Sequence, residues 1–310
     1  MNAFSSILFQ ITVMFLLIMS GVFLYRIHWI SEETNKQLSK IVISFVNPAL
    51  MFCAYTIEFK ESLLIGLLEA FGIAVITHLL FIAVSRFFLR KKDERYGLER
   101  YCCIYSNCAF IGIPLVSAVY GSEGVFYVTA YITVFNLLMW SHGIYLMSKD
   151  GEFDFVKKVL LSPTILATIL GMIVFFARIP VPQVILKPLE YIGSMNTPLA
   201  MIVSGVTIAQ SGFIKALKNG RIYQISFWKL LFVPLVVMAM FLFTGVNHMA
   251  LMATILVAAC PVATASTLLA MQYGQDEKYA SQIFGMTTIL SVVTLPLLVF
   301  LGEIVRRGCL

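Results

Sequence analysis

The chain has 310 residues, of which 60% are apolar and 12% are charged, and its formal net charge is +6 at pH 7. Soluble domains are about 45–50% apolar and about 25% charged, and a soluble fold of this size could not hide so large an apolar excess from water. The composition therefore indicates an all-α polytopic membrane protein. It excludes a secreted, fibrous, disordered or nucleic-acid-binding chain.

Charge-poor runs predict ten membrane-spanning helices, at about 20 residues per span. No Lys or Arg precedes the first apolar run, so we expect a retained first span and no cleaved signal peptide. The uncharged stretch from Leu230 to Gln275 is too long for one helix, and we expect a turn at residues 245–248. The predicted spans cover residues 6–25, 40–57, 63–84, 101–120, 124–147, 160–177, 188–209, 223–245, 249–272 and 281–302.

The basic residues of the loops set the orientation, because cytoplasmic loops carry an excess of Lys and Arg. Of the 22 Lys and Arg residues, sixteen fall in loops after odd-numbered spans and five fall on the other side. This bias predicts that the odd-numbered loops are cytoplasmic and that both termini lie outside the plasma membrane. The pair Arg306-Arg307 opposes the assignment but is outnumbered.

Prolines recur at matching places in the two halves of the chain. The second and seventh spans carry the runs 47–51 and 196–201, each with an Asn close to a proline, and the fourth and ninth carry Pro114 and Pro261. Since each half holds five spans, an odd number, the second half would run inverted relative to the first. The predicted organisation is two five-helix repeats, at residues 1–147 and 159–310, joined by a cytoplasmic linker at 148–158.

A proline inside a membrane helix removes one backbone hydrogen bond, so we expect breaks at Pro114 and Pro261. New half-helices would begin there, with their first free amides at residues 115–117 and 262–264. Each half-helix N-terminus carries about +0.5 charge and can bind an anion. In inverted repeats the two ends would face each other near the midplane, which predicts a carboxylate site. Two ordinary kinks are the alternative.

Several polar and small residues near these prolines are candidate substrate ligands. Ser117 and Thr264 each lie three residues after their proline, which suits helix capping or substrate contact. Asn107 lies seven residues before Pro114 on the same helix face, and it either binds substrate or makes an interhelical hydrogen bond. The predicted binding residues are Asn47, Asn107, Gly112, Pro114, Ser117, Asn196, Pro261 and Thr264.

Other polar residues inside the spans leave alternatives open. Asn47 and Asn196 lie one and two residues before a proline, and either could hydrogen-bond freed carbonyls or bind substrate. Glu69 and Lys229 are ionisable residues well inside spans, where a central charge costs about 2.5–3.5 kcal/mol. Lys229 could extend its amine to the membrane surface. Glu69 and His78 are candidates for proton coupling, although their spacing puts them on opposite helix faces.

Motifs for cofactors and catalysis are missing from the sequence. The six cysteines and four histidines show no metal-binding spacing. No P-loop, zinc motif, dinucleotide fingerprint or nucleophile triad occurs. We therefore expect no cofactor, no metal and no enzymatic activity, and we exclude an ATP-driven pump because no loop has room for a nucleotide-binding domain.

The run from Ser106 to Val116, followed by Tyr120-Gly121, resembles the fourth helix of the auxin efflux carrier family. This family includes plant auxin exporters and bacterial permeases for malonate-like acids. The runs 261–264, 273–274, 284–287 and 295–296 look like the last two helices of the same family. The short linker differs from the long cytoplasmic loop of plant members, so regulation through that loop does not carry over.

The resemblance implies an inverted 5+5 repeat with broken, crossed helices 4 and 9. It also implies a scaffold of helices 1, 2, 6 and 7, a transport part of helices 3–5 and 8–10, and often a homodimer. In plant members an asparagine seven residues before the fourth-span proline contacts the substrate carboxylate, and Asn107 matches that position.

These observations predict a secondary transporter that moves a small organic anion across the plasma membrane by alternating access. Its expected partners are the anion, the lipid bilayer and a second copy of the chain, with no nucleic acid. One alternative is a non-transporting membrane sensor or receptor for a small carboxylate, which would lack one of the two breaks or carry an output domain. An intramembrane enzyme would require clustered catalytic side chains.

Overall fold

A computed structural model describes residues 3–89, 94–148, 162–211 and 216–308. The predicted linker at 148–158 lies, apart from its first residue, outside the described residues. The first half of the chain forms α1 (Ala3–Arg26), α2 (Glu32–Ile41), α3 (Asn47–Ala54), α4 (Glu61–Phe88), α5 (Tyr96–Ile104), α6 (Ile113–Leu138) and α7 (Ile144–Met147). The second half forms α9 (Pro163–Ala177), α10 (Gln183–Ser194), α11 (Asn196–Gln210), α13 (Gly220–Phe227), α14 (Val233–Phe241), α15 (His248–Ala258), α16 (Ala265–Gln272) and α17 (Glu277–Gly308).

The described chain is helical, as predicted, with one isolated β-bridge between two helix interruptions. Two helices of this part, α9 and α15, are apolar but shorter than a full membrane span. The predicted turn at residues 245–248 is confirmed, because α15 begins at His248 after Asn247 caps its first turn. Seven helices in the described ranges are long and apolar enough to cross a membrane: Leu8–Arg26, Glu32–Ala54, Glu61–Phe88, Cys108–Met147, Gln183–Gln210, Gly220–Phe241 and Glu277–Ile304.

The second helical segment begins eight residues earlier than predicted, at Glu32 instead of residue 40. Ser31 caps it, since its hydroxyl accepts a hydrogen bond from the Thr34 amide at 3.1 Å. Glu32 and Glu33 then place negative charge at the positive end of the helix dipole. These local signals start a helix outside the apolar run, where a search for charge-poor stretches does not detect it.

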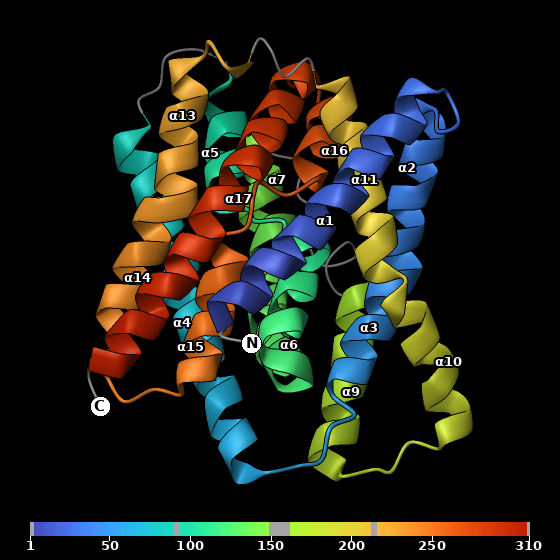
Figure 1. The fold of residues 1–310 in the computed structure, drawn as a ribbon, viewed down its shortest axis with the longest axis vertical. Helices are drawn as coiled ribbons and strands as arrows, with labels where there is room; N and C mark the ends of the chain where they lie inside the picture. Colours follow the sequence, from blue (N-terminus) through green and yellow to red (C-terminus); the bar gives the residue numbers. More distant parts are fainter. Residues whose placement is uncertain (1–2, 90–93, 149–161, 212–215, 309–310) are drawn as a thin grey trace.

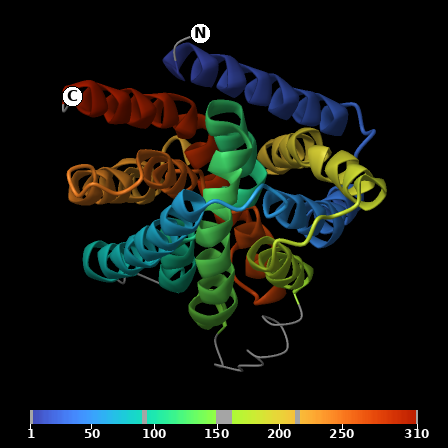
Figure 2. The same ribbon diagram turned by 90° about the horizontal axis from the view of Figure 1, so that it is seen from below.

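The 40-residue stretch Cys108–Met147 covers most of the predicted span 101–120 and all of the predicted span 124–147, and it bends at Gly121. Gly121 has a φ of 65°, a left-handed conformation that glycine adopts without a steric penalty. After this bend α6 runs through the centre of the bundle (Figure 2), where residues 124–132 are all buried. The fully buried core of the molecule is therefore organised around α6.

Four π turns lie within the helical runs of the described chain: η1 (Val42–Val46), η2 (Cys108–Gly112), η3 (Met139–Gly143) and η4 (Trp228–Phe232). Three of them end two residues before a proline, namely Pro48, Pro114 and Pro234. In the i→i+5 pattern of a π turn, the missing proline N–H frees the carbonyl five residues earlier. For Pro48 that carbonyl belongs to Ile43, and Thr164 of α9 donates its hydroxyl to it at 3.4 Å.

The helices α1 and α11 pack at unusually short range through two glycines. A Cβ atom added at Gly21 would fall onto the carbonyl oxygen of Ile202, and one at Gly205 onto that of Ile18. Figure 1 shows α1 lying across α11 beside α2. Small residues let helix backbones approach closely in a bilayer, so these glycines join α1 and α11 into one unit.

Candidate functional site

In the described part of the bundle, two interruptions at which the chain leaves the helical conformation altogether meet each other. The first lies at residues 105–107, between α5 and η2, and the second at residues 259–264, between α15 and α16. The second contains Pro261, as predicted. The predicted break at Pro114 is wrong, because the helical backbone passes through this proline from Cys108 onward and the chain instead unwinds seven residues earlier, at Asn107.

Pro114 is tolerated inside a helix because a side chain from another helix replaces its missing donor. The i→i+5 bonds of η2 run from the Gly112 amide to the Asn107 carbonyl and from the Ile113 amide to the Cys108 carbonyl. In this register the carbonyl without a donor is that of Ala109, not that of Phe110 as the α-helical pattern predicts. Asn196 Nδ2 donates to the Ala109 carbonyl at 3.2 Å.

The two interruptions hydrogen-bond to each other as a short antiparallel bridge between Ser106 and Val262. The Asn107 amide donates to the Pro261 carbonyl at 2.7 Å, and the Ala263 amide donates to the Tyr105 carbonyl at 3.0 Å. Backbone groups without a partner cost several kcal/mol each in a bilayer. The bridge satisfies them within the protein, and we call residues 105–107 and 259–264 together the crossing.

Several amides predicted to be free at the crossing are engaged. The Val262 amide donates to Thr287 Oγ1 at 3.2 Å, and the Ala263 amide belongs to the bridge. Residues 115–117 lie within the continuous helical run that η2 begins at Cys108 and α6 continues, so their amides are not at a helix start. The second half-helices begin at Cys108 and Ala265 instead, and the prediction that they begin at the prolines is wrong.

Asn107 and Thr264 join the two interruptions through their side chains. Asn107 Nδ2 donates to Thr264 Oγ1 at 3.0 Å, and both residues are buried. Asn107 directly precedes the helical run that starts at Cys108, and Thr264 directly precedes α16. The pair therefore lies between two helix N-termini, where partial positive charge gathers.

The other predicted ligands have different surroundings. Ser117 is exposed and lies ten residues along the chain from Asn107, about 15 Å of helix. Gly112 is buried where a Cβ atom would meet Val257 Cγ1 at 2.7 Å, so it lets the interrupted helices cross closely. Asn47 is buried, and its Oδ1 atom has no hydrogen-bond partner among the described residues. The structure thus brings together Asn107, Gly112, Pro261, Thr264 and, through Ala109, Asn196.

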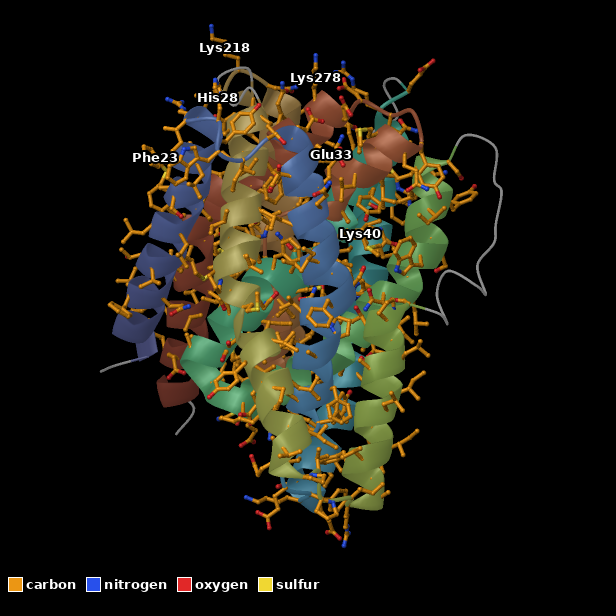
Figure 3. All side chains as sticks on the ribbon, turned by 90° about the vertical axis from the view of Figure 1, so that its right-hand side faces the viewer. Phe23, His28, Glu33, Lys40, Lys218 and Lys278 are labelled. Carbon is orange, nitrogen blue, oxygen red and sulfur yellow. The ribbon has the colours of Figure 1, made fainter. Side chains whose placement is uncertain are left out.

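A cavity of about 160 Å³ reaches the crossing from one end of the bundle. Figure 3 shows Lys218, Lys278 and Glu33 at this same end, which is the upper end in Figure 1. One wall belongs to α2 and α11 and the other to α16, α17 and Thr264. The lining is mostly polar and includes Glu32, Asn35, Lys36, Ser39, Thr207, Gln210, Thr267, Glu277, Lys278 and Ser281.

Lys229 of η4 lies against the crossing. It is fully buried, and its Nζ atom donates to Ser106 Oγ at 2.9 Å and to the Ile104 carbonyl at 3.5 Å. The interpretation that this lysine extends to the membrane surface is therefore wrong. The polar groups at the unwound end of α5 offer it acceptors in the interior, so the side chain turns inward.

Glu69 and His78 have separate surroundings, as their spacing predicts. Glu69 Oε2 accepts from the Asn247 amide at 2.8 Å, next to the start of α15. His78 is fully buried, with Nδ1 2.8 Å from the Ala74 carbonyl and its ring centroid 4.7 Å from that of Tyr131. Among the described residues, neither side chain hydrogen-bonds to the crossing, and a proton-coupling role for either stays a prediction.

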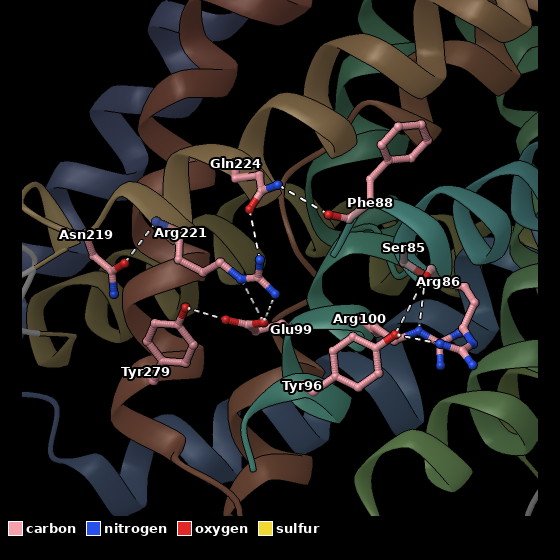
Figure 4. Close-up of polar contacts among 10 residues, drawn as sticks. All are labelled: Ser85, Arg86, Phe88, Tyr96, Glu99, Arg100, Asn219, Arg221, Gln224 and Tyr279. Carbon is pink, nitrogen blue, oxygen red and sulfur yellow. Dashed lines mark hydrogen bonds and ion pairs between the residues drawn. The ribbon is translucent and has the colours of Figure 1, made fainter. Parts of the chain in front are cut away.

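A buried ion pair connects three helices at the upper end of the bundle (Figure 4). Arg221 of α13 donates through Nε and Nη2 to Glu99 Oε2 of α5, at 2.9 and 2.7 Å. Tyr279 of α17 donates its hydroxyl to Glu99 Oε1 at 3.1 Å. The carboxylate is satisfied on both oxygens, so the ends of α5, α13 and α17 are held in one arrangement.

Comparison with known proteins identifies the family. The profile described as "Membrane transport protein" matches residues 6–155 and 152–299, nearly the whole chain. The chain belongs to this membrane transport protein family. The resemblance to auxin efflux carriers is thereby confirmed, and the protein is a multi-pass membrane protein of a transporter family.

Relatives within the family are similar along almost their full length. An "Uncharacterized transporter" of Methanothermobacter thermautotrophicus is 26% identical, over 91% of this chain and 93% of its own. "Uncharacterized transporter YfdV" of Escherichia coli is 23% identical, over 92% and 94%. A "Putative malonate transporter" of Rhizobium meliloti is 24% identical, over 90% and 89%.

Some residues at the crossing of this family member escape prediction from the sequence. Ser106 donates to the Ala258 carbonyl and Thr287 accepts from the Val262 amide, but a hydroxyl in an apolar run gives no sign of its partner. Lys229 gives a clearer signal, because a lysine within an apolar run either reaches the surface or serves a buried polar site. Glu99 and Arg221 count only as loop charges in the sequence, yet they form a buried pair.

Proposed function

We propose that the protein is a secondary transporter that moves a small organic anion across the plasma membrane by alternating access. One observation carries the proposal. The cavity lies between α2 and α11 on one side and α16 and α17 on the other, and Thr264 is part of its lining. The Thr264 hydroxyl accepts a hydrogen bond from the side chain of Asn107 in the crossing. A solute entering this cavity would reach two polar side chains and two helix N-termini.

The proposed architecture is ten transmembrane helices in two inverted five-helix repeats, residues 1–147 and 159–310. Helices 1, 2, 6 and 7 form the scaffold, which corresponds to α1, α2–α3, α9 and α10–α11. The remaining helices form the transport part, and a second copy of the chain would complete a homodimer. The antiparallel bridge at the crossing supports inversion of the repeats, since the two interruptions that it pairs run in opposite directions.

The proposed orientation places the upper end of the bundle in the cytoplasm and both termini outside. Lys36 and Lys278 line the cavity at this end, and Lys218 lies there too. All three belong to the loops that the positive-inside rule assigns to the cytoplasm. The cavity would therefore be the cytoplasmic entrance of an inward-open state.

A small carboxylate is the proposed substrate class. The side-chain amide of Asn107 and two helix N-termini offer hydrogen-bond donors and partial positive charge at one point. The cavity of about 160 Å³ is smaller than the roughly 300–1,000 Å³ of pockets that hold drug-sized ligands. The name of the Rhizobium meliloti relative refers to malonate, an acid of suitable size.

The predicted site residues would act in two ways. Asn107 and Thr264 would contact the carboxylate, while Gly112, Pro114, Pro261 and Asn196 would hold the crossing in shape. Asn47 Oδ1 is buried without a partner among the described atoms, so Asn47 is a further candidate for a donor group of the substrate. Ser117 and the coupling candidates Glu69 and His78 would be peripheral.

Transport by purified protein tests the proposal. The parent protein in liposomes should accumulate labelled malonate, succinate or acetate above the level of empty liposomes. Asn107→Ala should reduce this uptake while the protein stays monodisperse, and Ser117→Ala should leave it unchanged as a matched control. Absence of uptake for all three acids, together with binding of one of them, would favour the sensor over the transporter.

A further inference from the structure

We infer that Lys229 is a fixed positive charge next to the crossing that makes the site select anions over neutral analogues. The inference rests on the proposed function and adds a residue from outside the interrupted helices to the site. Lys229 would be a positioning and specificity residue, because it hydrogen-bonds to Ser106 of the crossing and to the Ile104 carbonyl at the end of α5.

The surroundings of the Lys229 amine consist of acceptors. Ser106 donates its own hydroxyl hydrogen to the Ala258 carbonyl at 2.7 Å, so its lone pairs face Nζ at 2.9 Å. The Ile104 carbonyl lies at 3.5 Å, and the centroid of the Phe81 ring lies at 5.0 Å. An ammonium group has three donors and no acceptor, which matches this environment.

The Lys229 amine lies close to both interruptions, through Ser106 and the Ala258 carbonyl to which Ser106 donates. Ile104 is the last residue of α5, and Ser106 lies within the first interruption, directly before Asn107. Ala258 is the last residue of α15, directly before the second interruption. The hydrogen-bond partner of Lys229, Ser106, is thus the residue directly before the proposed ligand Asn107.

This charge has no counterion in the part of the chain that the structure describes. No carboxylate there lies within 4.0 Å of Nζ. Glu99 is engaged by Arg221 and Tyr279, and Glu69 by the Asn247 amide. A buried charge without a partner is costly, and a carboxylate bound at Asn107 would supply the missing opposite charge.

Charge selectivity separates this role from a purely structural one. If Lys229 only braced Ser106, its replacement would change stability and weaken all ligands alike. A fixed charge near the substrate instead changes the ratio between a carboxylate and its uncharged amide. A unit charge about 10 Å away contributes roughly a tenfold factor to that ratio at an effective dielectric constant near 20.

The test measures the affinity ratio of an acid to its amide in purified protein, by isothermal titration. The acid is whichever of malonate, succinate and acetate the parent protein transports, and the amide is its neutral derivative. We expect Lys229→Met to lower the ratio by about tenfold or more and Lys229→Arg to preserve it. Ser106→Ala, the matched control, removes the bond but keeps the charge and should also preserve the ratio.

Each result decides between the alternatives. A Met variant with the parent's ratio would overturn the inference while leaving the proposed function intact. A parent protein that binds none of the acids would instead reject the proposed function. Lys229→Gln, which can still donate to Ser106, repeats the test if the Met variant does not fold. Failure of both neutral variants to fold would show that the charge serves the fold, and that too would overturn the inference.

Discussion

The side-chain amide of Asn196 donates to the carbonyl of Ala109 across a sequence distance of 87 residues, at 3.2 Å. Asn196 begins α11, and Ala109 lies in η2, just beyond the crossing. The bond supplies the donor that Pro114 cannot provide in the i→i+5 register. One asparagine therefore keeps a proline-containing helix intact and ties it to the neighbouring group of helices.

The roles of Asn196 and Pro114 predict a coupling between them. Asn196→Ala should lower the free energy of unfolding by about 1–3 kcal/mol, because it leaves the Ala109 carbonyl without a donor. In a Pro114→Ala background the restored N–H should reduce that cost by about 1 kcal/mol. Denaturant unfolding in detergent micelles measures both values. The cost of Asn47→Ala, the control, should be the same in both backgrounds, and an unchanged cost of Asn196→Ala would contradict the assignment.

Asn107 should control carboxylate binding. Asn107→Ala should weaken binding of a transported acid by about 1.5–3 kcal/mol, the range for a hydrogen bond to a charged group. Asn107→Asp should abolish it, because a carboxylate side chain repels the ligand. Isothermal titration measures both effects. Thr264→Val keeps the shape but removes the partner of Asn107, so an intermediate loss is expected. Parent-like affinity of the Asp variant would place the site elsewhere.

Glu99 and Arg221 should be strongly coupled in stability. Glu99→Gln removes the carboxylate that neutralises the largely buried Arg221 charge, and we expect a loss of about 3–5 kcal/mol in the free energy of unfolding. The double variant with Glu99→Met and Arg221→Met should lose less, since no charge then stays buried alone. Chemical unfolding compares the three proteins. Glu190→Gln removes an exposed ion pair with Lys187 and should cause no measurable change.

Gly205 should be intolerant of any side chain. Gly205→Ala would push its Cβ atom onto the Ile18 carbonyl oxygen and separate α1 from α11. We expect a loss of about 1–3 kcal/mol in stability from overpacking, measured by thermal unfolding. Gly72→Ala is the matched control, because its Cβ atom would meet nothing within 4 Å in α4. That variant should be as stable as the parent or slightly more stable.

The proposed orientation predicts which surface residues are reachable from outside the cell. In a cysteine-free background, a cysteine at Ser122 should react with an impermeant maleimide in intact cells. A cysteine at Glu33 should react only after the membrane is permeabilised. Both parent residues are exposed in the structure, so burial does not protect either position. Labelling of position 33 but not 122 in intact cells would invert the assignment.

The helices were predictable from the sequence because apolar runs and loop charges are local signals. The turn before His248 also has a local cause, since Asn247 caps α15 through its own side chain. The break near Pro114 was not predictable in the same way. Whether a proline interrupts a helix depends on whether its orphaned carbonyl finds another donor, and here the donor is Asn196 in the other half of the chain.

The candidate site was predictable in part for the same physical reason. The position of Asn107 followed from its spacing to Pro114, and that of Thr264 from its spacing to Pro261. Their mutual hydrogen bond, and the inward direction of Lys229, depend on how distant helices cross. A single sequence does not show how distant helices cross. The interpretation that Lys229 extends to the membrane surface was wrong for this reason.

The bridge between Ser106 and Val262 means that each interrupted helix supplies the backbone partners that the other lacks. Unwound peptide in a membrane usually depends on water or on a stationary neighbour, and either dependence would resist displacement. In the crossing, the Asn107 and Ala263 amides need neither water nor a neighbouring helix, because their acceptors belong to the crossing itself. In the proposed cycle it could change its depth in the bilayer as a rigid unit with its cargo. The energetic barrier would then lie where the adjoining helical run slides against its neighbours, α6 against α1 and α3 and η2 against α11.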